Sequence, residues 1–71
     1  MDVIKIGKYR HYKGKDYEVI GIARHSETLE ELVVYRALYG ERALWARPLT
    51  MFIENVEING VKIPRFEYLS E

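Results

Sequence analysis

The sequence lacks cysteine altogether, has only two prolines and contains no long apolar run. The missing thiols exclude a disulfide framework and thiolate chemistry, and they are compatible with a reducing compartment. No stretch approaches the roughly 18 consecutive apolar residues of a membrane span, and the N-terminus lacks the apolar core of a signal peptide. We therefore expect a soluble cytoplasmic protein without a membrane partner.

An excess of charge of either sign is also absent. Eleven basic residues balance eleven acidic ones, so the chain lacks the long-range positive field on which most sequence-independent nucleic-acid binders depend. A local basic face remains compatible with this balance, because lysine and arginine concentrate in residues 5–15. The length of 71 residues predicts one domain over residues 1–71 with a single small core.

What the chain does contain is a series of short strand-favouring segments separated by turn signals. Residues 8–12 and 17–23 flank a polar turn at residues 13–16 and together predict a hairpin. Gly21 inside the second segment predicts a bulge or a sharp bend. Residues 1–6 form a short lead-in that can either pair as an edge strand or fray.

The middle of the chain carries two competing signals. Thr28 followed by Glu31 matches a capping box, and apolar residues at 29, 32 and 33 recur at helical spacing. Against a helix, residues 33–35 read Val-Val-Tyr and Gly40 ends the run as a turn would. We predict one helical turn or an ordered loop, and then a strand from about Val33 to Tyr39. The alternative is an α+β domain in which residues 28–38 form a helix packed on a four-stranded sheet.

The last third of the chain has the clearest local signal. Residues 44–47 predict a short strand, and Pro48 favours a single helical turn that runs to Phe52. Asn59-Gly60, the dipeptide that a type I′ turn prefers, separates two segments of alternating apolar residues and predicts a second hairpin. Residues 65–69 then form an edge strand or a closing tail. Five to six short strands with one or two single-turn helices favour an all-β fold, a small closed or nearly closed barrel.

Four blocks of residues resemble a known family. They are Tyr-Arg-His-Tyr-Lys-Gly at 9–14, Arg-His-Ser-Glu-Thr-Leu-Glu at 24–30, Val-Val-Tyr-Arg-Ala-Leu-Tyr-Gly at 33–40, and Trp45 followed by Arg47-Pro48-Leu49 and Met51-Phe52. From Gly7 to Leu69 the chain resembles a compact bacterial family known only as a domain of unknown function. The resemblance implies an SH3-like barrel and carries over no catalytic residues.

Aromatic residues interleaved with arginines are the most informative candidates for a site. Rings of this kind can stack on a nucleobase or a peptide side chain, and guanidinium groups hold phosphate or carboxylate. About half of the rings are expected to pack in the core. The predicted ligand-binding residues are Arg10, His11, Arg24, His25, Tyr35, Arg36, Trp45 and Arg47.

The segment Arg24-His25-Ser26 supports two interpretations. Backbone amides at a turn, together with a guanidinium group, can hold an anion. Alternatively, a hydroxyl in this segment simply caps the turn and Arg24 pairs with a nearby glutamate. We favour capping, because capping motifs are far commoner than anion sites.

Catalytic and metal-binding functions have weaker support. The spacing of His11 and His25 matches no zinc signature, and Ser26, His25 and Glu27 are neighbours in sequence, which rarely face one another as a triad does. We expect no enzyme activity, no metal and no cofactor. The favoured hypothesis is a binding module whose unknown ligand is a nucleic acid, a nucleotide or a peptide. Second is an assembly module whose aromatic patch forms a homodimer or docks on a larger protein, and weakest is a small hydrolase centred on His25.

Overall fold

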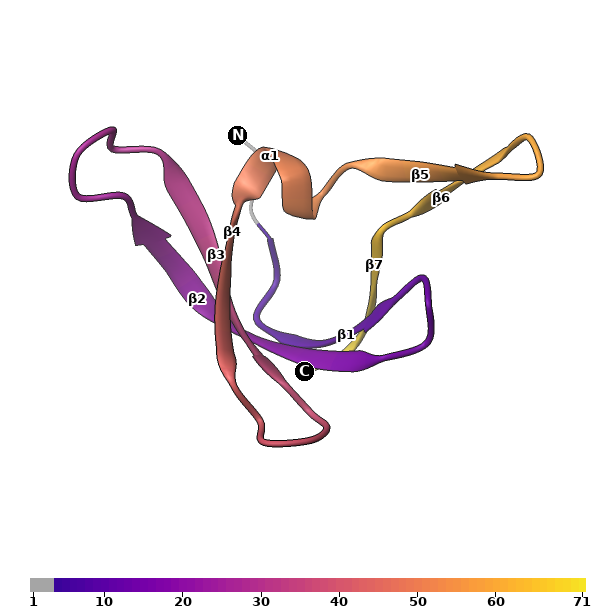
Figure 1. Ribbon diagram of the computed structural model, residues 1–71, viewed down its shortest axis with the longest axis horizontal. Coiled ribbons are helices and arrows are strands. Elements are labelled where there is room, and N and C mark those ends of the chain that lie inside the picture. Colours follow the sequence, from indigo (N-terminus) through magenta and orange to yellow (C-terminus); the bar gives the residue numbers. More distant parts are fainter. Residues whose placement is uncertain (1–3) are drawn as a thin grey trace.

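The structure, a computed structural model, describes residues 4–71. In chain order its elements are β1 (Gly7–His11), β2 (Asp16–Arg24), β3 (Glu31–Ala37), β4 (Leu44–Pro48), α1 (Leu49–Phe52), β5 (Asn55–Ile58), β6 (Val61–Pro64) and β7 (Phe66–Ser70) (Figure 1). The all-β prediction is confirmed, with one short helix. Residues 4–71 contain seven strands rather than five to six, because the last segment forms a strand of its own, Phe66–Ser70, and not a tail. The predicted lead-in lies partly outside the described residues, and residues 4–6 are not a strand.

Five strands form one antiparallel sheet in the order β4-β3-β2-β1-β7. The predicted hairpin of β1 and β2 is confirmed, with Tyr9 opposite Tyr17. The bulge predicted at Gly21 is also present, because the register between β2 and β3 shifts between Val19 and Gly21. An extra residue at this point bends the strand and increases its twist, which fits the strong curl of the sheet in Figure 1.

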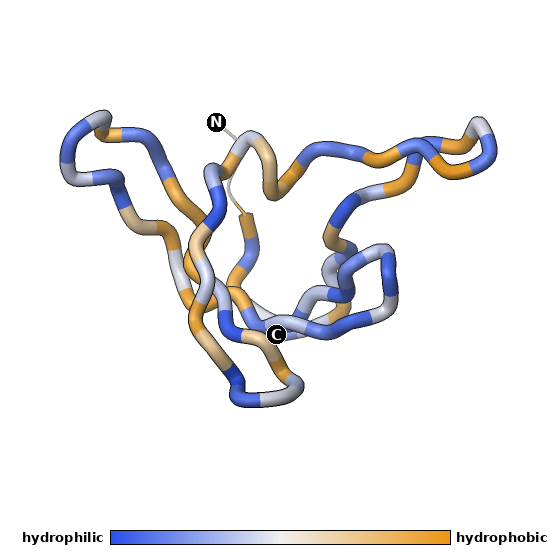
Figure 2. The backbone as a smooth tube through the Cα atoms, in the orientation of Figure 1, coloured by the Kyte–Doolittle hydropathy of each residue, from blue (hydrophilic) through white to orange (hydrophobic). Residues whose placement is uncertain are grey.

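The second sheet is the hairpin of β5 and β6. Asn59 and Gly60 at its turn have φ angles of 52° and 80°, the two successive positive values that a type I′ turn requires. The hairpin projects from the body of the molecule, and apolar residues alternate with hydrophilic ones along it as far as the turn (Figure 2). Two main-chain hydrogen bonds anchor its base, from Arg65 N–H to the Glu54 carbonyl at 3.1 Å and from Tyr12 N–H to the Arg65 carbonyl at 2.9 Å.

The middle of the chain is a strand rather than a helix. β3 starts at Glu31, two residues earlier than expected, and ends at Ala37 before a turn that contains Tyr39. Its buried residues alternate with half-buried ones, as they do in a strand with one face on the core. The segment between β2 and β3 is an ordered loop, closed by hydrogen bonds from His25 N–H to the Glu30 carbonyl and from Leu29 N–H to the His25 carbonyl.

The core lies on the concave side of the five-stranded sheet. It consists of Tyr9, Val19, Val33, Tyr35, Phe52 and Phe66. The rings of Phe52 and Phe66 are stacked, with centroids 4.1 Å apart and planes 4° from parallel. Phe52 comes from α1, the single turn predicted after Pro48, and its side chain is 1% exposed. The helix therefore closes the core and fixes the direction of the chain beyond β4.

The two edges of the larger sheet are β4 and β7, which are not paired with each other. The chain between these edges runs through α1 and the β5–β6 hairpin, opposite β1 in Figure 1. Within residues 4–71, no helix has the length and apolar character needed to cross a membrane.

Candidate ligand-binding site

The structure separates the eight predicted site residues into three groups. His11, Tyr35, Trp45 and Arg47 belong to the core-facing side of the sheet: Trp45 is opposite Tyr35, Arg47 is opposite the buried Val33, and His11 is opposite the buried Phe66. Arg10 and Arg36 occupy the alternate strand positions and face the other side. Arg24 is the last residue of β2, at the end opposite Asp16, and His25 follows it directly.

Arg47 is the centre of the first group. Its guanidinium carbon lies 5.9 Å from the centroid of the Phe66 ring, and its Nε donates a long hydrogen bond of 3.5 Å to the Tyr35 hydroxyl. The side chain is half-buried, and no carboxylate of the described chain lies within ion-pair distance of it. The positive charge of Arg47 therefore has ring and hydroxyl contacts but no acidic partner within residues 4–71.

Other rings pack closely on Phe66 and Tyr35, the two side chains that this guanidinium group contacts. Tyr17 contacts Tyr35 at 5.3 Å and Phe66 at 5.6 Å between centroids, and His11 contacts Phe66 at 4.9 Å, all edge-to-face. This is the arrangement that aromatic quadrupoles favour. We call Arg47 and these neighbours, together with Arg65, the Arg47 cluster: His11, Tyr17, Tyr35, Arg47, Arg65 and Phe66. Trp45 lies beside it on β4, 53% exposed.

The cluster is electropositive. Burial lowers the pKa of His11, and the positive charges of Arg65, Arg47 and Lys13 lower it further. The Nδ1 atom of His11 accepts a hydrogen bond of 3.2 Å from the Lys13 N–H. The neutral imidazole consequently carries its proton on Nε2, where it can act as a donor.

Arg65 is a member of the cluster that the sequence analysis missed. Its Nη2 is ion-paired with Glu54 Oε1 at 2.9 Å, while its Nε is buried and has no hydrogen-bond partner in the described structure. The residue stands between Pro64 and the buried Phe66, in the segment predicted as an edge strand or tail. Its position in the sequence is the signal that could have predicted it. Arg65 directly precedes Phe66, the buried residue that begins β7, and therefore lies at the edge of the core.

Tyr17 and Tyr39 extend the ring cluster toward the turn after β3. Their hydroxyl oxygens are 2.6 Å apart, and either group can donate. Burial, and then the hydrogen bond and charge of Tyr39, raise the pKa of Tyr17 to about 12. The Tyr17 hydroxyl is therefore a neutral donor or acceptor at physiological pH rather than a general base.

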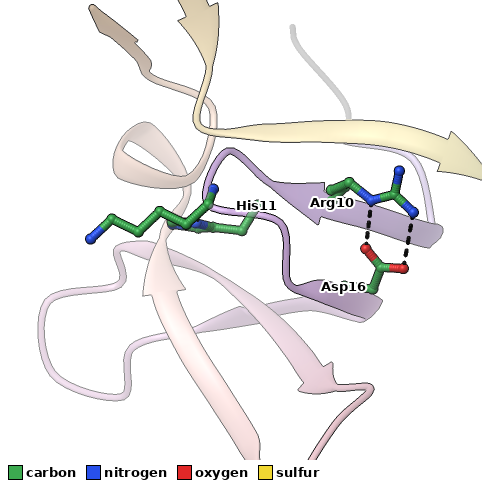
Figure 3. Close-up of polar contacts among 4 residues, drawn as sticks. Arg10, His11 and Asp16 are labelled. Atoms are coloured by element: carbon green, nitrogen blue, oxygen red, sulfur yellow. Dashed lines mark hydrogen bonds and ion pairs between the residues drawn. The ribbon is translucent and has the colours of Figure 1, made fainter. Parts of the chain in front are cut away.

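Arg10 is held on the opposite side of the sheet by an ion pair with Asp16. The Nε–Oδ1 distance is 2.8 Å and the Nη2–Oδ2 distance is 3.3 Å, as Figure 3 shows. These hydrogen bonds, which Arg10 donates and Asp16 accepts, lower the pKa of Asp16 and raise the pKa of Arg10. Arg36 likewise donates from Nη1 to the Arg42 carbonyl at 3.0 Å. Neither residue reaches the Arg47 cluster.

The loop after Arg24 uses its own donors internally. The His25 Nδ1 accepts hydrogen bonds from the backbone N–H groups of Glu27 at 3.1 Å and Thr28 at 3.3 Å. The Thr28 hydroxyl oxygen accepts one from Glu30 N–H at 3.2 Å. The amides that could have faced an anion are thus satisfied by the loop, which favours the capping interpretation of this segment.

Two hollows flank the Arg47 cluster. One of about 290 Å³ is lined by Ile4, Lys5, Tyr9, Phe52, Ile53, Phe66 and Tyr68. The other, of about 310 Å³, lies beside His11 and is lined also by Arg10, Tyr12, Gly14, Ile63, Pro64 and Glu67. Both volumes stand at the lower end of the range of ~300–1,000 Å³ typical of small-molecule sites. They suit a fragment of a ligand rather than an enclosed substrate.

The fold and the cluster thus define a small all-β domain with an open arginine and aromatic face. Residues 7–68 match the model of a family described as "Protein of unknown function (DUF1653)", and the chain belongs to this family. A crystal structure of a DUF1653 protein from Bordetella bronchiseptica matches with a TM-score of 0.85 and 40% identity, over 93% of this chain and 87% of that chain. No curated protein matches the chain.

Proposed function

We propose that this chain is a small non-catalytic binding module of SH3-like form that holds an anionic group at the Arg47 cluster, with an adjoining part of the ligand on Trp45. One observation carries the proposal: Arg47 is half-buried over Phe66 and has no carboxylate partner within residues 4–71. Arg10 and Arg65, by contrast, are each ion-paired with a carboxylate.

The chemistry of the cluster supports an anion rather than a cation. Three cationic side chains act on His11, and a guanidinium group binds anions such as carboxylate or phosphate through two parallel hydrogen bonds. The exposed Trp45 ring adds a surface for a base or an aliphatic chain, worth about 1–3 kcal/mol per stacked base. The ligand class is therefore a carboxylate or phosphate attached to an apolar or planar group, bound in the cytoplasm, a location with which the absence of cysteine is compatible.

A binding role without catalysis has two supports. The pKa of Tyr17, about 12, keeps its hydroxyl neutral at physiological pH. The Nδ1 atom of His11 accepts a hydrogen bond from the Lys13 N–H. Neither group is therefore arranged to activate a nucleophile. The His25 ring serves its own loop through Nδ1. The hydrolase hypothesis has no comparable contact in its favour.

The test is a fluorescence titration, since Trp45 is the one tryptophan of the sequence. AMP, a single-stranded uridine hexanucleotide and a glutamate-containing hexapeptide serve as probes. We expect at least one probe to change the Trp45 emission. Arg47→Gln should lower the affinity for that probe about tenfold, which is the effect of losing one charge-assisted hydrogen bond. Arg24→Gln is the matched control, because Arg24 lies at the far end of β2 and should leave binding unchanged. No response to any of the three probes, or equal weakening by both variants, contradicts the proposal.

A further inference from the structure

β4 is an edge strand whose outward main-chain groups can be assigned. Ala37 N–H donates to the Ala43 carbonyl at 3.0 Å, and the same register continues through Tyr35 opposite Trp45. In an antiparallel pair, hydrogen-bonded and non-hydrogen-bonded positions alternate. The N–H and C=O groups of Leu44 and Ala46 therefore point away from β3, along the open edge of the sheet.

The first three residues of this edge strand are open. Proteins commonly shield an edge strand with a bulge, an inward charge or a proline in the strand. The register of β4 on β3 runs without a shift over all five pairs, and the inward charge of Arg47 and the proline, Pro48, both stand at the C-terminal end of the strand. Leu44, Trp45 and Ala46 are all exposed. Within residues 4–71 the main chain of β4 pairs with β3 alone, and the Arg47 side chain reaches over Phe66 of β7.

The charges around the edge are mainly positive, with Glu41 the one acidic residue between Ala37 and Pro48. Arg42 precedes β4, Arg36 is opposite Leu44, and Arg47 lies near the other end. None of these three forms an ion pair with a carboxylate of residues 4–71. The other edge strand, β7, contains Glu67 instead. The β4 edge is therefore complementary to an acidic extended chain.

We propose that β4 binds an acidic, extended peptide segment of another protein as an added strand of the sheet. The main chain of the segment forms hydrogen bonds with Leu44 and Ala46. A carboxylate that the segment places on the concave, core-facing side of the sheet reaches Arg47. Side chains directly opposite on adjacent strands stand about 4.5–5.5 Å apart at Cβ, within reach of a glutamate. This inference rests on the proposed function, because Arg47 is the anion-holding group in both.

The probe is the peptide acetyl-Thr-Glu-Val-Glu-Val-Thr-amide. In a strand its two glutamates share one face and its two valines the other, so one set meets Arg47 and the other covers the side chains of Leu44 and Ala46. Binding is followed by ¹⁵N NMR and amide exchange. We expect slowed exchange at the amides of Leu44 and Ala46, and affinity about tenfold lower for the peptide with glutamine in place of both glutamates.

A second peptide separates main-chain pairing from anion binding. It carries N-methyl groups on the alternate amides that would pair with β4, so it keeps both carboxylates and loses the donors. We expect it to bind at least about tenfold more weakly. If instead it binds equally well and the Leu44 and Ala46 amides stay unprotected, strand addition is overturned while the anion site stands. If the glutamine peptide binds as well as the glutamate one, both the acidic specificity and the proposed function fail.

A protein variant gives an independent check. Ala46→Pro removes an N–H that faces outward and contributes nothing to the β3–β4 pairing, and Ala46→Ser keeps that N–H. We expect the proline variant to lose peptide binding and the serine variant to retain it, both with folded spectra; the N-methylated peptide decides the matter if the proline variant unfolds. Sedimentation of the free protein completes the test: self-association that Ala46→Pro abolishes would identify the occupant as a second copy and overturn the proposal.

Discussion

Gly7 is the position where one added methyl group should do the greatest damage to the backbone. Its φ angle is +143° and the residue is buried at the start of β1. A Cβ built on it would overlap the Ser70 carbonyl oxygen and lie 2.9 Å from the Glu71 Cα. Both obstacles are main-chain atoms of the C-terminal end of the chain, so they cannot move aside as a flexible side chain would.

The cost of Gly7→Ala has two parts. A non-glycine residue forced into a positive-φ region costs about 1–3 kcal/mol. Relieving the overlap requires a backbone shift between β1 and β7, and overpacking of this kind costs about 1–3 kcal/mol more. The sum, about 2–6 kcal/mol, is comparable to the whole stability of a chain of this length, for which ~0.05–0.15 kcal/mol per residue gives about 4–11 kcal/mol.

Gly21→Ala is the matched control. No atom lies within 4 Å of a Cβ built at Gly21, and its φ is not positive, so we expect a change within about 1 kcal/mol, including a small gain from the less flexible unfolded chain. Urea unfolding, followed by Trp45 fluorescence, measures both free energies. Similar midpoints for Gly7→Ala and wild type would refute the close approach of β1 and β7 at this point.

Three further predictions test the core and the titrating groups. Phe52→Ala should lower the free energy of unfolding by about 3–5 kcal/mol, because it removes a 1%-exposed ring stacked on Phe66. Met51→Ala, at an exposed neighbour, should change that free energy by less than about 0.5 kcal/mol. Equal effects of the two variants on urea unfolding would contradict the packing of Phe52 on Phe66. Burial and the nearby cations hold the pKa of His11 below its usual 6.5, so the unfolded chain binds a proton that the folded chain does not. The fold should then lose stability as pH falls below about 6.5, and His11→Gln should flatten that part of the stability profile. Tyr39→Phe should lower the pKa of Tyr17 from about 12 toward 10.0, because it removes the hydrogen bond that adds to the effect of burial. Ultraviolet titration of tyrosinate measures this pKa. The raised pKa also means that the free energy of unfolding of the wild type should fall as pH rises from 10 to 12.

Local signals predicted those elements whose conformation is decided locally. Asn59-Gly60 is sufficient to specify a hairpin, because both residues accept the positive φ angles of the turn. The ordered segment from Leu49 to Phe52 follows a proline whose fixed φ suits a helix start. The segment from Glu31 to Ala37 was harder, since its spacing fits a helix and its residue types fit a strand. Pairing with β2 on one side and β4 on the other decides it, and such non-local pairing leaves no local signal.

The candidate site was predicted only in part, because residue type was known and strand register was not. His11, Tyr35 and Arg47 meet through three different strand pairings. One error was avoidable in physical terms. Consecutive residues of a strand face opposite sides of a sheet, so Tyr35 and Arg36 could not both face one ligand once that segment was a strand. The same parity separates Arg10 from His11.

The distribution of charge provides the strongest reason to regard the Arg47 cluster as incomplete in the isolated chain. Partial burial of a guanidinium group costs solvation free energy that a carboxylate would normally offset. The contact with Phe66 returns only about 0.5–2 kcal/mol, and the 3.5 Å hydrogen bond to Tyr35 is long. The carboxylates of Asp16 and Glu54 form ion pairs with Arg10 and Arg65 instead. Because these two carboxylates are already paired with Arg10 and Arg65, an anion supplied from outside is what the geometry of Arg47 would accept with the greatest gain.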